Sequence, residues 1–421
     1  MKTTTKQYRI LLVSLLIGLC STVLNAQDVY VAGYENNGTN DVAMLWKNGT
    51  PQTLSDGTNS ATARSVFVSG SDVYVAGYED NGTNYVATLW KNGTPQTLTD
   101  GTNQATAQSV FVSGSDVYVA GLESNGTNLV ATLWKNGTPQ YLTNGANDAQ
   151  AISVFVYGSD VYVAGYEDNG SSYVAMLWKN GTPQGITDGT NGAVAQSVFV
   201  SGNDVYVSGN EYNGTHDVAK IWKNGTPQIL TDSTNNGVAP SVFVSGSDVY
   251  AAGYETDYSD YVAKLWKNGM PQSLNLGSNN SSTISVYVSG SDVYLAGYES
   301  NGTNDVATLW KNGIPQDLTN GSNNAAAASV FVDDGQLGTE EIIATPQNNI
   351  TLYPNPTQDI LHVKTKDDNI QKIDLFSMTG QRLKSWEGKS EINMAQFSPG
   401  SYFVKITTGM EQTVVKQIVK K

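Results

Sequence analysis

Seven glutamates recur at one spacing and are the residues whose type could do chemistry. They stand 44 residues apart, at Glu35, Glu79, Glu123, Glu167, Glu211, Glu255 and Glu299. Carboxylate oxygens are hard ligands that suit calcium, so the candidate site binds a cation or a polyhydroxy ligand. No repeat has the full D-x-[DN]-x-[DN]-G spacing of a calcium loop. The alternative is that they are solvated loop residues copied by duplication. Calcium is the candidate metal, and no other cofactor is predicted.

Catalysis has little support in the sequence. The only histidine of the repeated region is His216, and no Ser-His-Asp set, zinc spacing or phosphate-binding loop is present. The repeated carboxylates leave one alternative, an extracellular polysaccharide hydrolase or lyase. A catalytic pair normally occupies a locally distinctive site, whereas these units are nearly uniform. The sequence therefore favours a non-catalytic binding surface over an enzyme.

Seven tryptophans raise a second hypothesis, the stacking of sugars on aromatic rings. Each tryptophan precedes Lys-Asn-Gly, at Trp46, Trp90, Trp134, Trp178, Trp222, Trp266 and Trp310. A recurring aromatic residue beside a tight turn usually packs against neighbouring elements. We therefore predict that the tryptophans pack between repeats, at the end opposite the glutamate loops.

These residues are carried by a repeat of 44 residues, a period typical of four-stranded propeller blades. The motif DVYVAG or a close variant begins at residues 28, 72, 116, 160, 204, 248 and 292. In the unit at 65–108, SVFV, DVYVAGY, YVATLW and PQTLT are expected strands. Asn-Gly after Trp-Lys suits a tight hairpin turn, and Asn-Gly-Thr triplets suit Asx-type turns. DGTNQATAQ at 100–108 is expected as the link to the next blade.

The ends of the repeat array predict a closed ring. The first unit lacks an SVFV strand, and residues 329–332 provide an SVFV strand with no partner after it. The last strand is therefore expected to complete the first blade and remove the exposed edges of an open array. The predicted fold is all-β, with a seven-bladed β-propeller at 27–332 and a small C-terminal β-sandwich.

Charge limits the partners of the propeller. Residues 27–344 contain 10 basic and 31 acidic residues, a net charge of 10 − 31 = −21. A surface of this sign makes nucleic acid a poor partner. Carbohydrate or another surface protein is the expected ligand, and seven similar units would allow multivalent binding.

The first 26 residues predict a secretory signal peptide. Lys2, Lys6 and Arg9 precede an apolar run, and Ala26 supplies a small residue at the cleavage side. A lipoprotein signal using Cys20 is the alternative, but Leu19 stands where a small residue is preferred. Cys20 is the only cysteine of the chain, so the mature protein would have no disulfide. No other apolar run is long enough to span a membrane.

The C-terminal residues depart from the repeat. Residues 333–344 are acidic and indicate a linker, and short strands broken by Pro and Gly turns follow at 345–421. His362 lies in one of these strands and is expected to be packed or exposed rather than liganded. Four sequence motifs stand out in this region: YPNP at 353–356, DLFSMTG at 374–380, SPGSYFVK at 398–405 and a lysine-rich end at 416–421.

This combination resembles the type A C-terminal sorting domain of the type IX secretion system of Bacteroidota. The matching residues are Tyr353, Pro354, Asn355, Pro356, Gly380, Pro399, Gly400, Tyr402, Lys405 and Lys416. The resemblance implies that the type IX machinery is a partner and that the protein reaches the outer cell surface or the medium. The repeats themselves resemble arrays in uncharacterised secreted proteins of such bacteria, which implies no activity.

Overall fold

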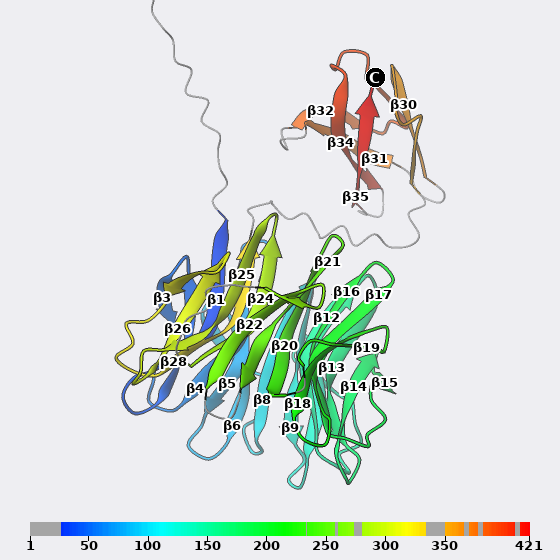
Figure 1. The fold of residues 1–421 in the computed structure, drawn as a ribbon. Coiled ribbons are helices and arrows are strands. Elements are labelled where there is room, and N and C mark those ends of the chain that lie inside the picture. The colour runs from blue at the N-terminus through cyan, green and yellow to red at the C-terminus, as the bar shows by residue number, and fades with distance from the viewer. Residues whose placement is uncertain are drawn as a thin grey trace, which may run out of the picture.

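The computed structural model describes residues 27–232, 234–256, 260–272, 280–333, 350–365, 370–377, 382–408 and 413–421. The predicted signal peptide, most of the predicted linker and Gly380 lie outside these ranges. All regular elements that the structure describes are β-strands. Residues 28–333 form seven four-stranded sheets, and residues 351–420 form two further sheets (Figure 1).

Each of the seven sheets is one blade, written here from its innermost to its outermost strand. Blade 1 is β28 (Ala325–Asp333), β1 (Asp28–Asn36), β2 (Asp41–Lys47) and β3 (Thr50–Thr53). Blade 2 is β4 (Ala61–Ser69), β5 (Asp72–Asp80), β6 (Tyr85–Lys91) and β7 (Thr94–Thr97). Blade 3 is β8 (Ala105–Ser113), β9 (Asp116–Ser124), β10 (Leu129–Lys135) and β11 (Thr138–Tyr141). Blade 4 is β12 (Ala149–Tyr157), β13 (Asp160–Asp168), β14 (Tyr173–Lys179) and β15 (Thr182–Gly185).

The remaining blades follow the same order. Blade 5 is β16 (Ala193–Ser201), β17 (Asp204–Tyr212), β18 (Asp217–Lys223) and β19 (Thr226–Ile229). Blade 6 is β20 (Asn236–Ser245), β21 (Asp248–Thr256), β22 (Tyr261–Lys267) and β23 (Met270–Pro271). Blade 7 is β24 (Ser281–Ser289), β25 (Asp292–Ser300), β26 (Asp305–Lys311) and β27 (Ile314–Asp317). All strand pairs within the blades are antiparallel, for example β4 with β5 and β5 with β6.

The innermost strands are longer than the sequence suggests. In blade 3, β8 already begins at Ala105, so the expectation that 100–108 is entirely a linking turn is wrong. The missed signal is a β-bulge between Ala107 and Ser109, which interrupts the alternation of side chains. Gly121 faces this segment, and a Cβ there would overlap the carbonyl oxygen of Thr106. Glycine is therefore required where the second strand crosses the bulge.

The ring closes as predicted. β28 pairs along its length with β1, from Asp28 opposite Asp333 to Glu35 opposite Ala325, so the last strand completes the first blade. In Figure 1 the chain begins in blue and returns in yellow to the same sheet.

Two rings of side chains from the SVFV motif join the blades around the central axis. Each motif serine accepts a hydrogen bond at 3.1–3.3 Å from a valine N–H of the following blade, and Ser329 accepts one from Val66 across the closure. Seven aromatic rings contact their neighbours at centroid distances of 4.7–5.2 Å. They are Phe67, Phe111, Phe155, Phe199, Phe243, Tyr287 and Phe331. The serine bonds satisfy N–H groups of strands that have no further strand on their inner side.

The apolar core lies between blades rather than within them. One cluster joins Tyr74 and Ala76 of blade 2 to Val110 and Val119 of blade 3. A four-stranded sheet leaves two apolar faces uncovered, and each is buried by the next blade in the ring. This interface is called a seam below.

The C-terminal residues form a β-sandwich. One sheet has the order β29 (Thr351–Tyr353), β30 (Ile360–Lys364) and β33 (Glu391–Asn393). The other has the order β32 (Arg382–Glu387), β31 (Ile370–Ser377), β34 (Gly400–Thr408) and β35 (Thr413–Lys420). Leu361 and Ile392 of the first sheet share one buried cluster with Leu375 and Val404 of the second. Among the residues that the structure describes, no helix is long and apolar enough to cross a membrane.

Candidate functional site

The blades present two different faces. The loop face carries the connections between the second and third strands, such as 81–84, and the links between blades, such as 98–104. The turn face carries the tight hairpins, such as 70–71 and 92–93. The recurrent glutamates stand near the loop face, because each is the next-to-last residue of a second strand that ends on that side.

The glutamates are strand residues, which corrects the expectation that they belong to loops. Glu79 pairs with Val86 on one side and with Ala61 on the other, and its side chain is half-buried. The other six occupy the same position of their blades and are also half-buried. Side chains alternate along a strand, so Val119 and Glu123, four residues apart in β9, lie on the same face of blade 3. Val119 packs against blade 2, so each glutamate faces the preceding blade.

The seven glutamates are not equivalent. Glu211 forms an ion pair with Lys220 at 2.6 Å, and Glu255 forms one with Lys264 at 2.7 Å. Glu123 accepts a hydrogen bond from the hydroxyl of Tyr141 at 3.2 Å. In blades 5 and 6 a lysine therefore neutralises the charge of the glutamate, whereas the described residues of the other blades place no lysine beside it. The glutamate is the same in all seven blades, but the charge of the residues that contact it differs from blade to blade.

Burial changes the titration of four of the glutamates. It raises the pKa of Glu35, Glu79, Glu167 and Glu299 above the ordinary 4.5, with a smaller contribution from Asp56 at Glu79 and from Asp317 at Glu299. Removing water from a carboxylate disfavours its charged form. The folded state therefore binds a proton at these sites more tightly than the unfolded chain does.

The substitution Glu79→Gln tests this charge penalty. Because the folded pKa of Glu79 lies above the unfolded one, the contribution of Glu79 to stability falls as the pH rises from about 4.5 through the folded pKa. We expect the variant to melt on the order of 1 °C higher than wild type at pH 7 and no higher at pH 4. Glu211→Gln is the matched control, and it should melt lower at pH 7 because it leaves Lys220 unpaired. Equal shifts for both variants in scanning calorimetry would contradict the assignment.

The described residues bring no three acidic, histidine or cysteine side chains together as a metal site requires. Each glutamate instead belongs to a separate sheet. Calcium binding by the glutamates stays a prediction.

The polar loop residues are largely used by the fold. The side-chain oxygen of Asn81 accepts hydrogen bonds from the backbone N–H groups of Thr83 and Asn84, and its amide donates to the carbonyl of Gly101. These contacts confirm the predicted Asx-type turns. In blade 5 the backbone N–H of His216 makes the corresponding bond to Asn213, so His216 takes the place of the second asparagine.

The tryptophans are packing residues, as predicted. All seven are at most 2% exposed. Trp90 lies in one cluster with Tyr30 and Ala32 of blade 1 and with Val66 and Val75 of its own blade. The indole N–H of six of them has no hydrogen-bond partner in the structure. Sugar stacking on these rings is therefore excluded by their burial.

Pairs of tyrosines on the loop face were missed by the sequence reasoning. Tyr78 and Tyr85 of blade 2 have ring centroids 4.7 Å apart. The same pair occurs in blade 4 as Tyr166 and Tyr173, at 4.5 Å, and in blade 6 as Tyr254 and Tyr261, at 5.0 Å. The second member of each pair is exposed, by 38% to 43%. The signal that could have found them is the first residue of the third strand, one of the positions at which the copies differ.

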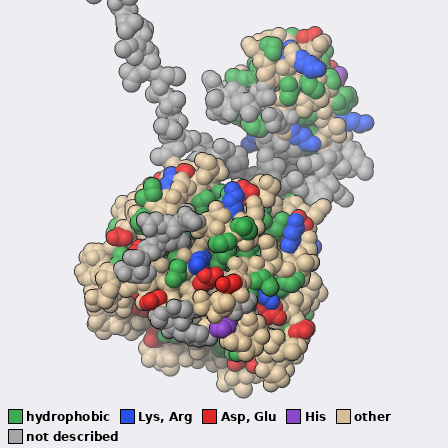
Figure 2. Space-filling model, viewed as in Figure 1, with side chains coloured by type: hydrophobic (Ala, Val, Ile, Leu, Met, Phe, Trp, Pro, Cys, Tyr) green, Lys and Arg blue, Asp and Glu red, His purple; other side chains and the backbone are tan. Residues whose placement is uncertain are grey.

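That position is tyrosine in every even-numbered blade and another residue in the odd-numbered ones. It is Asp41, Tyr85, Leu129, Tyr173, Asp217, Tyr261 and Asp305 in blades 1 to 7. Two of the aspartates are bonded within their own blades, since Asp41 accepts from Asn36 and Asp217 accepts from Asn210. Figure 2 shows charged side chains of both signs interspersed with apolar ones, without a block of one sign on the face in view.

The turn face is neutralised within each blade. Asp72 accepts a hydrogen bond from Asn92 and pairs with Lys91 at 2.7 Å, and the Lys91 ammonium lies 5.2 Å from the ring centre of Tyr74. The lysine and asparagine hydrogen bonds lower the pKa of Asp72 below its usual 3.8. The same lysine–aspartate pair recurs in all seven blades at 2.7 Å.

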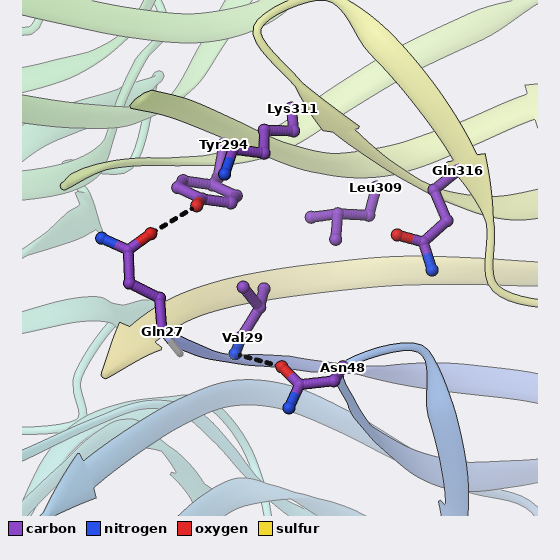
Figure 3. Close-up of a pocket in the computed structure, with 7 residues that line it drawn as sticks. All are labelled: Gln27, Val29, Asn48, Tyr294, Leu309, Lys311 and Gln316. Carbon is purple, nitrogen blue, oxygen red and sulfur yellow. Dashed lines mark hydrogen bonds between the residues drawn. The ribbon is translucent and has the colours of Figure 1, made fainter. Parts of the chain in front are cut away.

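A cavity of about 310 Å³ opens on the turn face at the seam between blades 7 and 1 (Figure 3). Most of its polar side chains already have partners. The side chain of Gln27 accepts from the Tyr294 hydroxyl and donates to Ser289, and the Asn48 oxygen accepts from the N–H of Val29. Lys311, its one ionisable amine, pairs with Asp292. The cavity therefore has no group free for acid–base chemistry.

The sorting-motif residues lie mainly on the edges of the sandwich. The Asn355 side-chain oxygen accepts a hydrogen bond at 2.8 Å from the N–H of Val419, which ties the YPNP segment to the last strand. Tyr353 is exposed and stacks on His362 at 5.2 Å, and His362 pairs through Nδ1 with Glu391 at 3.0 Å. The Tyr402 hydroxyl donates to the carbonyl of Ser398 at 2.6 Å.

The other motif residues are distributed along the same domain. Pro354, Pro356 and Pro399 are exposed, and Gly400 is the first residue of β34. Lys405 and Lys416 are half-buried on the paired strands β34 and β35. His362 is both packed and partly exposed, in agreement with expectation.

Comparison with solved structures finds chains of low identity. TolB from Acinetobacter baumannii matches with 13% identity and a TM-score of 0.39, over 58% of this chain and 64% of that one. A putative TolB from Agrobacterium tumefaciens matches with 10% identity and a TM-score of 0.38, over 73% of this chain and 96% of that one. Hydrazine synthase from Kuenenia stuttgartiensis matches with 10% identity and a TM-score of 0.41, over 94% and 67%. Likeness at these scores carries no functional argument.

Comparison with protein families finds a match for the C-terminal residues. Residues 351–421 match the family described as the secretion system C-terminal sorting domain. No curated protein matches the chain. The match covers the β-sandwich and the motifs that resemble the type IX signal. The chain is therefore a type IX secreted protein with a β-propeller fold, and its residues 351–421 are the sorting domain.

Proposed function

We propose that the propeller is a non-catalytic binding protein, that it takes carbohydrate on its loop face, and that it acts at the cell surface or in the medium after export. The sorting domain implies the export. The contrast between the two faces of the propeller carries the rest of the proposal.

The turn face has little left to offer a ligand, because its aspartates are bonded to lysine and asparagine in every blade. The loop face combines half-buried carboxylates with exposed tyrosine rings. Ligand sites typically join apolar and aromatic contact area with a few polar groups that fix orientation. Sugars present both an apolar ring face and hydroxyl groups, which fits this combination.

A hydrolase or lyase is the less favoured alternative. Glycoside hydrolysis requires two carboxyl groups on either side of one bond. The recurrent glutamates belong to seven different blades, and two of them are held by lysines. Repetition at this level supports a surface that contacts an extended ligand several times.

Retention without turnover is the test. The purified full chain should retain glycans on an array and should leave a polysaccharide panel unchanged, with no new reducing ends and no unsaturated products. Release of such products would replace the proposal with an enzyme. Retention of a surface protein and of no glycan would contradict carbohydrate as the ligand.

A further inference from the structure

The three tyrosine pairs have a shared position that points to a defined ligand. Tyr78 lies on the same face of β5 as Tyr74 and Ala76, which pack against blade 3. The pair of Tyr78 and Tyr85 therefore stands at the loop-face end of the seam between blades 2 and 3, which we call the mouth of that seam. The pair of blade 4 stands at the mouth of the seam between blades 4 and 5, and the pair of blade 6 stands at the mouth of the seam between blades 6 and 7. From blade 2 to blade 7 the mouths with a pair alternate with mouths that lack one, and the two mouths on either side of blade 1 both lack a pair.

A glutamate stands on the opposite wall of each of these mouths. Glutamates face the preceding blade, so Glu123 faces the pair of blade 2, Glu211 faces that of blade 4, and Glu299 faces that of blade 6. Each mouth thus combines an aromatic pair on one wall with a carboxylate on the other. Glu123 is bonded to a tyrosine hydroxyl, and Glu211 is neutralised by Lys220.

Exposure makes the rings available. Tyr85, Tyr173 and Tyr261 are 38%, 43% and 42% exposed, whereas their partners are half-buried. The inner ring supports the outer one, and an aromatic ring held in place by a neighbour presents contact area at low entropic cost. Burial raises the pKa of Tyr166 to about 12 and that of Tyr254 above its usual 10, so these inner hydroxyls stay protonated and can donate hydrogen bonds.

The copies differ at the tyrosine positions, which sets the pairs apart from residues that duplication alone repeats. Blade 3 has Leu122 and Leu129 at the two positions, and blade 5 has Asn210 and Asp217. No described lysine or arginine other than Arg64, Lys220 and Lys264 lies in the strands near the loop face. Lys220 and Lys264 are held by glutamates, whereas Arg64 is exposed at the mouth of blade 2, where it lies over the ring of Tyr78 and donates a hydrogen bond to its hydroxyl. At the mouths of blades 4 and 6 an acidic sugar would therefore find, among the described residues, no lysine or arginine that lacks a carboxylate partner.

We infer that the seam mouths of blades 2, 4 and 6 are three stacking sites for a neutral polysaccharide, with the tyrosine pairs as the platforms and the facing glutamates as hydrogen-bond acceptors for sugar hydroxyls. This inference rests on the proposed function and names its site and ligand class. Sugar rings stack on Tyr85, Tyr173 and Tyr261, and one chain can contact more than one mouth.

The test uses the full chain and immobilised neutral polysaccharides (cellulose, xylan and mannan) beside acidic ones (alginate and pectin). The triple variant Tyr85→Ala, Tyr173→Ala and Tyr261→Ala should bind neutral polysaccharide about fivefold more weakly at each mouth, which corresponds to about 1 kcal/mol for one lost ring contact. The triple Phe variant keeps the rings and should retain nearly as much as wild type. Leu122→Tyr with Leu129→Tyr should increase retention by adding a fourth pair, which keeps the test valid if the Ala variant does not fold.

Three outcomes separate the inference from the proposed function. If wild type binds neutral glycans and the folded Ala variant binds them equally, the tyrosine sites are wrong and carbohydrate binding stands. If wild type retains only acidic polysaccharides, the ligand class is wrong. If wild type retains no glycan at all, the proposed function fails, and the stacking sites fail with it.

Discussion

Deletion of residues 329–332 is expected to abolish the single cooperative unfolding transition of the propeller. The deletion removes the centre of β28, which pairs with β1 and supplies the inner strand of blade 1. It also removes Ser329, the acceptor for Val66, and Phe331, which contacts both Phe67 and Tyr287. Blades 1 and 7 then lose Val330 and Val332 from their shared cluster, and β1 becomes an exposed edge that can pair with another chain.

Calorimetry and light scattering measure this effect. A chain truncated after Asp333 is the matched control, because it keeps β28 and lacks only the residues beyond it. The control should melt in one sharp transition, and the deletion variant should melt broadly or aggregate at lower temperature. A deletion variant that melts as sharply as the control would show that closure does not stabilise the ring.

Trp134→Ala should destabilise the propeller by about 3–5 kcal/mol, the usual cost of truncating a large buried aromatic residue. The indole is fully buried in the seam between blades 2 and 3, among Ala76, Leu89 and Val119. It fills the space above Gly121, where a Cβ would contact the indole ring. Replacement by alanine leaves a cavity that two rigid sheets cannot close.

Denaturant unfolding of two control variants makes this prediction specific. Trp134→Phe should cost less than Trp134→Ala, since it keeps an aromatic ring and the lost indole N–H has no hydrogen-bond partner. Ile314→Ala changes a side chain that is 72% exposed and should shift stability by no more than about 0.5 kcal/mol. A Trp134→Ala effect as small as that of Ile314→Ala would contradict a packing role.

Repetition made the architecture readable. A fixed step of 44 residues, Asn-Gly turns and alternating apolar residues predict four-stranded units, and Asn92 and Gly93 have the positive φ angles, 52° and 79°, that such a turn needs. The missing first SVFV and the surplus last one predict the closure that β28 and β1 make. The sorting motifs could also be recognised from the sequence, because the residues of each motif are contiguous.

The inner strand and the site were harder to predict. A bulge at Gln108 shifts the alternation of side chains, so a period of two cannot be followed from SVFV back to Ala105. The glutamates looked like loop residues because they precede Asn-Gly-Thr, yet Glu79 is paired on both sides within the sheet. The pairing of Tyr78 with Tyr85 depends on a cross-strand diagonal that only the register defines.

The sequence by itself determined the number of blades, the closure of the ring and the sorting domain, because local turn chemistry and a constant repeat length are written in contiguous residues. Only the tertiary structure decided which repeated residues remain available to a ligand. Seven tryptophans are buried in the seams, seven aspartates of the turn face are paired with lysines, and the outer tyrosine of each of the three pairs on the loop face stays exposed. The physical reason is that availability depends on what the neighbouring blade covers, and neighbouring blades meet through residues that lie one repeat apart in the chain.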